Sequence, residues 1–255
     1  MRANYHTHTF RCGHATGTER EYIENALAGG IEILGFSDHC PYDLPGLHPG
    51  IRMASEELEG YVAALRALRE EYAGRIELHI GLEAEYYPAG FSALLRHARA
   101  AGIEYLILGQ HFLGNEAGDA YNGAPTEDLR QLDRYVAQSI EAMDTGVFTY
   151  FAHPDLIHFT GDTKAYEDAA RTLCRAAKER GLPLEINLLG LRTGRNYPDE
   201  RFWRVAGEEG CDVILGCDAH DNRALWVPKT EAAARAMAER SGLEVLETLE
   251  LRRLQ

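Results

Sequence analysis

Short apolar runs alternate with amphipathic segments along most of the chain. Residues 105–108 and 213–215 are continuously apolar, which is typical of parallel strands buried on both faces. The segments between such runs carry apolar residues at helical spacing, and Thr18 with Glu21 predicts a capping box at the start of one helix. The predicted strands are residues 4–9, 33–37, 76–83, 105–109, 148–152, 183–187 and 212–217.

This repeated strand–helix order predicts an α/β fold. The chain has no linker rich in Pro, Gly or Ser and no internal repeat, so residues 1–255 are expected to form one domain. A closed parallel (β/α) barrel is the expected architecture. A doubly wound open sheet is the alternative.

Composition bears on whether the chain folds in solution and in which compartment. Hydrophobic residues make up 45% of the chain, enough for a sizeable core, and no apolar run approaches the length of a membrane span. The N-terminus has no apolar stretch followed by a cleavage site, so no signal peptide is expected. Five scattered cysteines without a C-x-x-C pair indicate free thiols in a reducing, cytoplasmic location.

The formal charge of −14 argues against a nucleic-acid partner, because a long polyanion would be repelled. The densest basic run, between Arg192 and Arg204, is too sparse to follow a phosphate backbone. A small-molecule substrate is therefore expected, and the chain is expected to be a monomer or a homodimer.

Metal-ligating residue types follow six of the seven predicted strands. In a parallel barrel the carboxyl ends of the strands converge on one face, where active sites are built. His6 and His8 are two apart on a strand, so both imidazoles point the same way, and Asp218 with His220 repeats this spacing. The candidate ligands are His6, His8, His14, His39, Glu83, His111, His153, Asp218 and His220.

A single buried histidine is usually a satisfied core residue, and we prefer that explanation for His79; His48 and His97 are expected on the surface. Core packing does not explain the histidines as a group, because seven of the eleven fall just after predicted strand ends. One zinc-like ion takes three or four protein ligands, so nine candidates predict two or three ions. Imidazole and carboxylate suit Zn, Mn and Fe alike.

The charge of such a site indicates its substrate. Three divalent ions carry +6, and only Glu83 and Asp218 among the ligands are anionic, which leaves +4, or +3 with one bridging hydroxide. A phosphate monoester dianion fits this charge better than a neutral amide or a sugar does.

The order of these motifs along the chain resembles the PHP (polymerase and histidinol phosphatase) family. The motifs are an H-x-H with a histidine six residues on, a D-H, a G-L-E, two single histidines and a D-x-H. The resemblance implies a distorted seven-stranded (β/α) TIM-like barrel with three divalent ions. It implies one ion held by His6, His8, Glu83 and Asp218, a second by Glu83, His111 and His153, and a third by His14, His39 and His220.

Several local phrases are similar to the monofunctional histidinol phosphatases of this family: residues 37–39, 111–112, 153–156, 185–187, 190–192 and 197–198. This likeness implies hydrolysis of L-histidinol phosphate to L-histidinol and phosphate, a step of histidine biosynthesis, by attack of a metal-bridging hydroxide on phosphorus. Gln110 stands where those enzymes more often have Val, and residues 113–125 have no familiar counterpart. That segment is expected to shape substrate choice.

The same likeness suggests roles for individual residues. Glu83, Asp218 and His220 are expected in the catalytic centre. Arg192, together with Arg195, is expected to hold the phosphate through paired N–H donors. A solvated loop arginine is the ordinary alternative for both.

Other polar residues are candidates for contacts with the rest of the substrate. His158 is expected to line the substrate pocket, and either His158 or Asp155 could protonate the leaving alkoxide. Glu185, Glu116 or Asp119 could bind the ammonium group of histidinol, and the sequence does not choose among them.

Other functions are open at this point. Related proteins act on other small phosphate esters or on nucleotides, and a phosphate-release screen would discriminate these substrates. A metal-binding regulatory module without turnover would be expected to lack some ligands, whereas all nine are present. An amidohydrolase-type site would typically show a lysine at a strand end, and none of the predicted strands ends in lysine.

Overall fold

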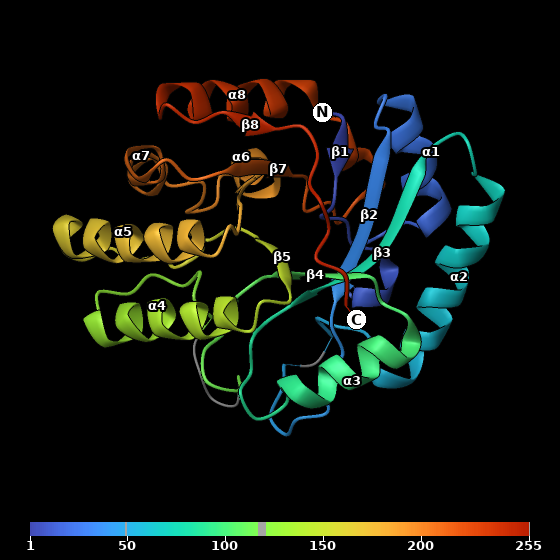
Figure 1. The fold of residues 1–255 in the computed structure, drawn as a ribbon, viewed down its shortest axis with the longest axis horizontal. Coiled ribbons are helices and arrows are strands. Elements are labelled where there is room, and N and C mark those ends of the chain that lie inside the picture. The colour runs from blue at the N-terminus through green and yellow to red at the C-terminus, as the bar shows by residue number, and fades with distance from the viewer. Residues whose placement is uncertain (49, 117–120, 255) are drawn as a thin grey trace.

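A computed structural model describes residues 1–48, 50–116 and 121–254, which form one curled parallel sheet flanked by helices (Figure 1). Each strand pairs in parallel with the next strand along the chain. The strands of the described residues are β1 (Ala3–Asn4), β2 (Ile33–His39), β3 (Glu77–Ala84), β4 (Tyr105–Leu108), β5 (Phe148–Phe151), β6 (Leu184–Asn187), β7 (Val213–Gly216) and β8 (Val245–Leu246).

The helices lie along the outside of the curled sheet. Figure 1 shows α1, α2 and α3 beside the first strands, and α4, α5, α7 and α8 in a row at the other end of the sheet. The α-helices are α1 (Glu19–Ala28), α2 (Leu58–Glu71), α3 (Phe91–Ala101), α4 (Leu129–Asp144), α5 (Thr163–Glu179), α6 (Leu188–Thr193), α7 (Glu200–Glu209) and α8 (Pro228–Arg240). Short 3₁₀ helices are η1 (Phe10–Cys12), η2 (Ser55–Glu57) and η3 (Asn222–Leu225).

The predicted α/β architecture is confirmed: each of the seven predicted segments overlaps an observed strand, and the two-residue β8 is added at one edge. The first predicted strand was too long, because β1 ends at Asn4 and His6 and His8 lie in the segment after it. The strand order follows the chain without reversal, so the doubly wound alternative is wrong. The sheet is a half-barrel, and the segments that follow β1 and β7 contact each other. Thr7 and Ala219 form an isolated parallel bridge, and the His8 backbone N–H donates to the Ala219 carbonyl at 3.0 Å. Because this bridge follows β1 and β7, the strand ends that carry the predicted ligands come together.

The interior of the sheet is filled by aromatic side chains. Tyr5, Tyr105 and Tyr150 are buried there, and the Tyr105 hydroxyl donates to the Tyr5 carbonyl at 2.8 Å. Gly81 makes room for this ring, because a Cβ at that position would lie 2.3 Å from Tyr105 Cε1. The interior of the half-barrel is therefore filled by side chains. The polar cluster lies at one end of this interior, at the carboxyl ends of the strands.

The C-terminal segment covers the opposite end of the sheet. From β8 it returns across the first strands in Figure 1. Leu249 and Leu251 pack against the aromatic cluster, and the Leu254 N–H donates to the Glu104 carbonyl at 3.0 Å. No helix in the described part of the chain is long and apolar enough to cross a membrane. All five cysteines are buried, and none forms a disulfide with another.

Glu104, just before β4, connects several elements at this end. Its carboxylate accepts two hydrogen bonds from Arg69, at 2.8 and 2.9 Å, and one from the Ile80 N–H at 3.1 Å. The imidazole of His79, a buried residue of β3 as expected, lies 3.6 Å from the same carboxylate. Burial alone would raise the pKa of Glu104, but the nearby His79 and the hydrogen bonds from Arg69 and Ile80 outweigh it and lower the pKa to about 2.

Glu104→Gln is expected to lower the free energy of unfolding at pH 7 by about 1–2 kcal/mol, a modest figure because the carboxylate is partly exposed and screened by solvent. A carboxyl whose pKa is depressed on folding stabilises the protein above its unfolded pKa of 4.5 and loses that effect as the pH falls toward 2. Urea unfolding at pH 7 and pH 3.5 tests this. The stability difference between wild type and variant should shrink at the lower pH, and a constant difference would contradict the ionic role.

Candidate metal centre

The nine predicted ligands converge at the carboxyl end of the sheet. His39 is the last residue of β2 and lies in register with Glu83 of β3. His14 follows η1 after a turn at Gly13, whose φ of +83° suits glycine. The remaining ligands lie two to four residues beyond a strand: His6, His8, His111, His153, Asp218 and His220. The alternation of strands and helices thus brings together residues up to 214 positions apart, from His6 to His220.

Glu83 is the centre of this cluster, and it is 1% exposed. Each of its carboxylate oxygens faces histidine nitrogens. The nitrogens within 3.4 Å are His153 Nε2 (2.9 Å) and His111 Nε2 (3.3 Å) beside Oε1, and His39 Nδ1 (3.1 Å), His8 Nε2 (3.3 Å) and His6 Nε2 (3.4 Å) beside Oε2. A carboxylate placed in this way can bridge two ions, because its two oxygens address different sets of imidazoles.

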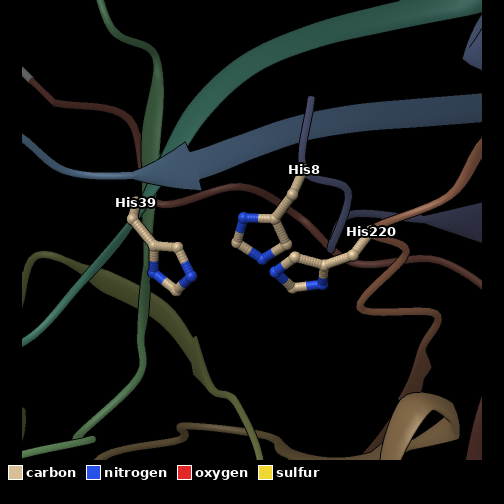
Figure 2. A group of neighbouring side chains, drawn as sticks. All are labelled: His8, His39 and His220. Atoms are coloured by element: carbon tan, nitrogen blue, oxygen red, sulfur yellow. The ribbon is translucent and has the colours of Figure 1, made fainter. Parts of the chain in front are cut away.

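Three of the histidines approach one another closely in Figure 2. His8 comes from the segment after β1, His39 from the end of β2 and His220 from the segment after β7. The ring centroid of His8 lies 4.4 Å from that of His39 and 4.2 Å from that of His220. One ring nitrogen from each lies within 4.8 Å of the others, so the three could act as donors to one ion.

Two ligands are oriented by carboxylates outside the predicted set. His6 Nδ1 lies 2.8 Å from Glu185 Oε2, and His111 Nδ1 lies 2.9 Å from Glu85 Oε1. When Nδ1 carries the proton and donates to the carboxylate, Nε2 keeps its lone pair and faces the cluster. These roles of Glu85 and Glu185 were not predicted. Glu85 is two residues from Glu83, the same spacing that identified His6 and His8, and this was the available signal.

The electrostatics of the cluster favour ionised carboxylates. Burial alone would raise the pKa of Glu83, but His111, His6 and His39 outweigh it and hold that pKa well below its usual range. Burial alone would lower the pKa of His6, but Glu185, Asp218 and Glu83 outweigh it and raise that pKa to about 10. The buried carboxylates thus favour positive charge on the groups around them, and a bound divalent cation would supply it.

The donor atoms fit divalent cations. His14 Nδ1 lies 3.1 Å from the Cys12 carbonyl and His220 Nδ1 lies 3.2 Å from the Asp218 carbonyl, so both Nδ1 atoms are placed to donate. The two Nε2 atoms then face each other at 2.9 Å, close enough for both lone pairs to bind one ion that lies beside them. Glu83 Oε2 is buried and has no hydrogen-bond partner among the described residues, which gives a further unmet acceptor aimed into the cluster.

Buried carboxylates outside the ligand set also affect the charge of the site. Glu85 and Glu185 lie in contact with ligand histidines, and Arg52 lies 3.4 Å from Glu85 and offsets part of their negative charge. The site with three ions would remain cationic and would still favour an anionic substrate.

A cavity of about 790 Å³ opens beside the cluster. Predicted ligands form one side of it, while apolar and aromatic side chains form much of the rest. His158 and Arg195 lie at its wall, where the sequence analysis expected them, and Arg195 Nη1 donates to the Tyr197 hydroxyl at 2.8 Å. Apolar and aromatic residues of the wall are Ile51, Phe112, Tyr121, Leu189 and Tyr197.

Arg192 is not among the described residues that line this cavity. It lies on α6, whose Leu189 does face the cavity, but the Arg192 guanidinium is directed toward η3, with Nη1 3.5 Å from the Ala224 carbonyl. In this arrangement α6 turns the Arg192 side chain to the neighbouring segment, and a role of Arg192 in holding the phosphate or in catalysis stays a prediction.

Other candidates for substrate contacts are paired with protein groups in the structure. Asp155 is 1% exposed and accepts a hydrogen bond from Trp203 Nε1 at 2.8 Å, so it fixes α7 and does not face the cavity. Glu185 and Glu116 are fully buried and already paired, with His6 and Arg52 respectively. Asp119 lies outside the described residues.

The protein is a curled parallel α/β sheet with a histidine-rich cluster at the carboxyl ends of its strands. Comparison with known proteins identifies the family that has this arrangement. The chain belongs to the PHP domain family, whose model matches residues 4–188. A protein of Deinococcus radiodurans named "Probable histidinol-phosphatase" is 33% identical over 225 residues, which cover 84% of this chain and 85% of that protein. The histidinol-phosphatase of Bacillus subtilis is 26% identical over 247 residues, which cover 84% and 92%.

The fold is also found in a solved structure. The histidinol phosphate phosphatase of Lactococcus lactis, whose crystal structure is complexed with zinc, L-histidinol and phosphate, superposes with a TM-score of 0.76. The alignment covers 98% of both chains at 18% identity, and at that identity it shows the shared fold.

Proposed function

We propose that this protein is a metal-dependent phosphomonoesterase that hydrolyses L-histidinol phosphate to L-histidinol and phosphate. The observation that carries the proposal is the convergence of metal-ligand side chains around Glu83 beside a cavity that also contains Arg195. The choice of substrate is supported by the two relatives named as histidinol-phosphatases, which align with 84% of the chain.

We assign the ligands to three divalent ions, which are Zn, Mn or Fe. Sharing of Glu83 between two ions is supported by its two oxygens, which face different histidines. The close approach of His14 Nε2 and His220 Nε2 supports a further ion. The proposed sets are His6, His8, Glu83 and Asp218 for the first ion, Glu83, His111 and His153 for the second, and His14, His39 and His220 for the third.

When bound, the ions supply Lewis acidity toward the phosphate oxygens and lower the pKa of a water molecule at the site. Arg195 is proposed to orient the phosphate through its N–H donors, with its own position fixed by Tyr197. His158, at the same wall, is proposed to protonate the leaving alkoxide. The apolar side of the cavity holds the remainder of the substrate and excludes water.

The cavity suits a small molecule, since about 790 Å³ is in the range of pockets for metabolite-sized ligands. We further propose that residues 1–255 act as one domain. This is supported by the C-terminal segment, which hydrogen-bonds to Glu104 beneath the same sheet that carries the site.

A phosphate-release screen combined with metal removal tests the proposed function. Histidinol phosphate is expected to be hydrolysed faster than nucleotides, sugar phosphates or phosphotyrosine. Dialysis against a chelator should abolish the activity, and Zn²⁺, Mn²⁺ or Fe²⁺ should restore it. His6→Ala should lose both bound metal and activity. Full activity in protein shown to be metal-free would overturn the metal mechanism, and a strong preference for another phosphate ester would overturn the substrate.

A further inference from the structure

We propose that Arg52 is a positioning residue that joins the ligand His111 to the wall of the substrate cavity. The inference rests on the proposed metal site and adds to it a side chain that lies in the loop between β2 and α2. Two buried glutamates, Glu85 and Glu116, form its two contacts.

The first contact leads to the metal ligand. Arg52 Nη2 lies 3.4 Å from Glu85 Oε1, and the same oxygen lies 2.9 Å from His111 Nδ1. The side chains of Arg52 and Glu85 are only 7% and 2% exposed, so the carboxylate charge is shielded from water and needs a cation nearby. With Glu85 held in place as an acceptor, His111 donates from Nδ1, and its Nε2 stays 3.3 Å from Glu83 Oε1.

The second contact leads to a loop of the cavity. The guanidinium of Arg52 forms a two-pronged pair with Glu116, at 3.2 Å to Oε1 and 2.8 Å to Oε2. Glu116 is fully buried and also accepts from the His48 N–H at 2.6 Å and from the Tyr87 hydroxyl at 2.8 Å. Its φ is +71°, a conformation that L side chains rarely adopt and that these four contacts hold in place.

Arg52 is thereby linked to two residues of the cavity wall. Ile51 precedes it in the chain, and Phe112 follows His111; both line the cavity. The His48 ring stacks on Phe112 with centroids 4.7 Å apart, and the His48 backbone is bound to Glu116. One buried guanidinium therefore sets the orientation of a metal ligand and the position of the adjacent apolar wall.

The two carboxylates beside Arg52 explain why an arginine suits this position. Among the described residues, Arg52 is the only lysine or arginine within 4.0 Å of either Glu85 or Glu116. Its planar group has enough N–H donors to reach both carboxylates at once, whereas the single ammonium of lysine satisfies them less well. Removal of Arg52 would leave two buried carboxylates without this cation, and Glu85 would be free to turn away from His111.

The test measures zinc binding directly, by competition with a chromophoric chelator. Arg52→Met is expected to weaken the binding of one ion about tenfold or more, the usual effect of losing a contact behind a metal ligand. In a Glu85→Gln background the same substitution should weaken zinc binding no further, because Arg52 acts through Glu85. Glu116→Gln should leave zinc affinity within about twofold and raise KM for the substrate found in the screen.

Arg69→Met is the matched control, since it also breaks a two-pronged pair, with Glu104, but at the opposite end of the sheet. Its zinc affinity should equal that of the wild type. Arg52→Lys keeps the buried charge, and it should show weakened zinc binding or a raised KM even where Arg52→Met prevents folding. Wild-type zinc affinity in folded Arg52→Met, or wild-type zinc affinity and KM in Arg52→Lys, would overturn this inference alone. A wild-type protein that binds no zinc, manganese or iron would instead overturn the proposed function beneath it.

Discussion

Glu83→Gln is expected to lower phosphatase activity about 1000-fold or more and to remove bound metal, with little change in the fold. The carboxylate is the only side chain of the described cluster whose two oxygens face five ligand histidines. Glutamine keeps the size of the side chain but is neutral, and its amide nitrogen would point a donor toward nitrogens that should bind metal. Metal analysis and phosphate release on the same preparation measure both effects.

Glu77→Gln is the matched control for this substitution. Glu77 begins β3, the strand that carries Glu83, but its side chain is 61% exposed and its nearest partner is His79 at 2.9 Å. Loss of this charge should leave metal content and activity at wild-type levels. Comparable metal content and activity in Glu83→Gln and wild type would show that the bridging assignment is mistaken.

Gly109→Ala is expected to reduce kcat about 100-fold, although no functional group is removed. A Cβ at this position would lie 2.0 Å from Glu83 Oε1 and 2.6 Å from its Cδ. The carboxylate would have to move by roughly an ångström, which is enough to disturb its alignment with the histidines. Reduced kcat together with weaker zinc binding would show that the displacement acts on the metal site.

Gly60→Ala provides the corresponding control. Gly60 lies in α2, and the nearest atom to an added Cβ is Arg11 Nη1 at 4.0 Å. Alanine should fit without movement and raise the free energy of unfolding by about 0.5–1 kcal/mol, because it favours the helix. Activity should not change. If Gly109→Ala behaved like Gly60→Ala, the close approach at Glu83 would have no functional consequence.

The strands could be predicted because their signal is local. Each of the seven predicted segments overlaps an observed strand. Thr18 is the N-cap of α1 and forms the predicted capping box with Glu21. The edge strand β8 escaped prediction because Val245–Leu246 is only two residues long and half-buried, so it carries no pattern. The ligand set could be proposed for a related reason. A histidine or carboxylate placed just after an apolar run marks the same end of every strand in a parallel sheet.

The contacts behind the ligands could not be predicted in this way. Glu185 meets His6 across 179 positions of sequence, and Arg52 meets Glu116 across 64. Neither pair has a periodic signal, because each depends on how loops and strands far apart in the chain are brought together. The direction of a side chain within a short helix depends equally on its surroundings, and the contact of Arg192 with the Ala224 carbonyl is therefore not predictable from local sequence.

Local pattern accounts for the α/β class, the parallel strands and the residues gathered at their carboxyl ends, because strand burial and side-chain alternation are visible in short stretches of sequence. Long-range packing sets which oxygens of Glu83 face which histidines, brings Arg195 rather than Arg192 to the cavity, and places Arg52 between Glu85 and Glu116. These depend on distances of about 3 Å between segments far apart in the chain, which are set by packing of the whole sheet and its loops.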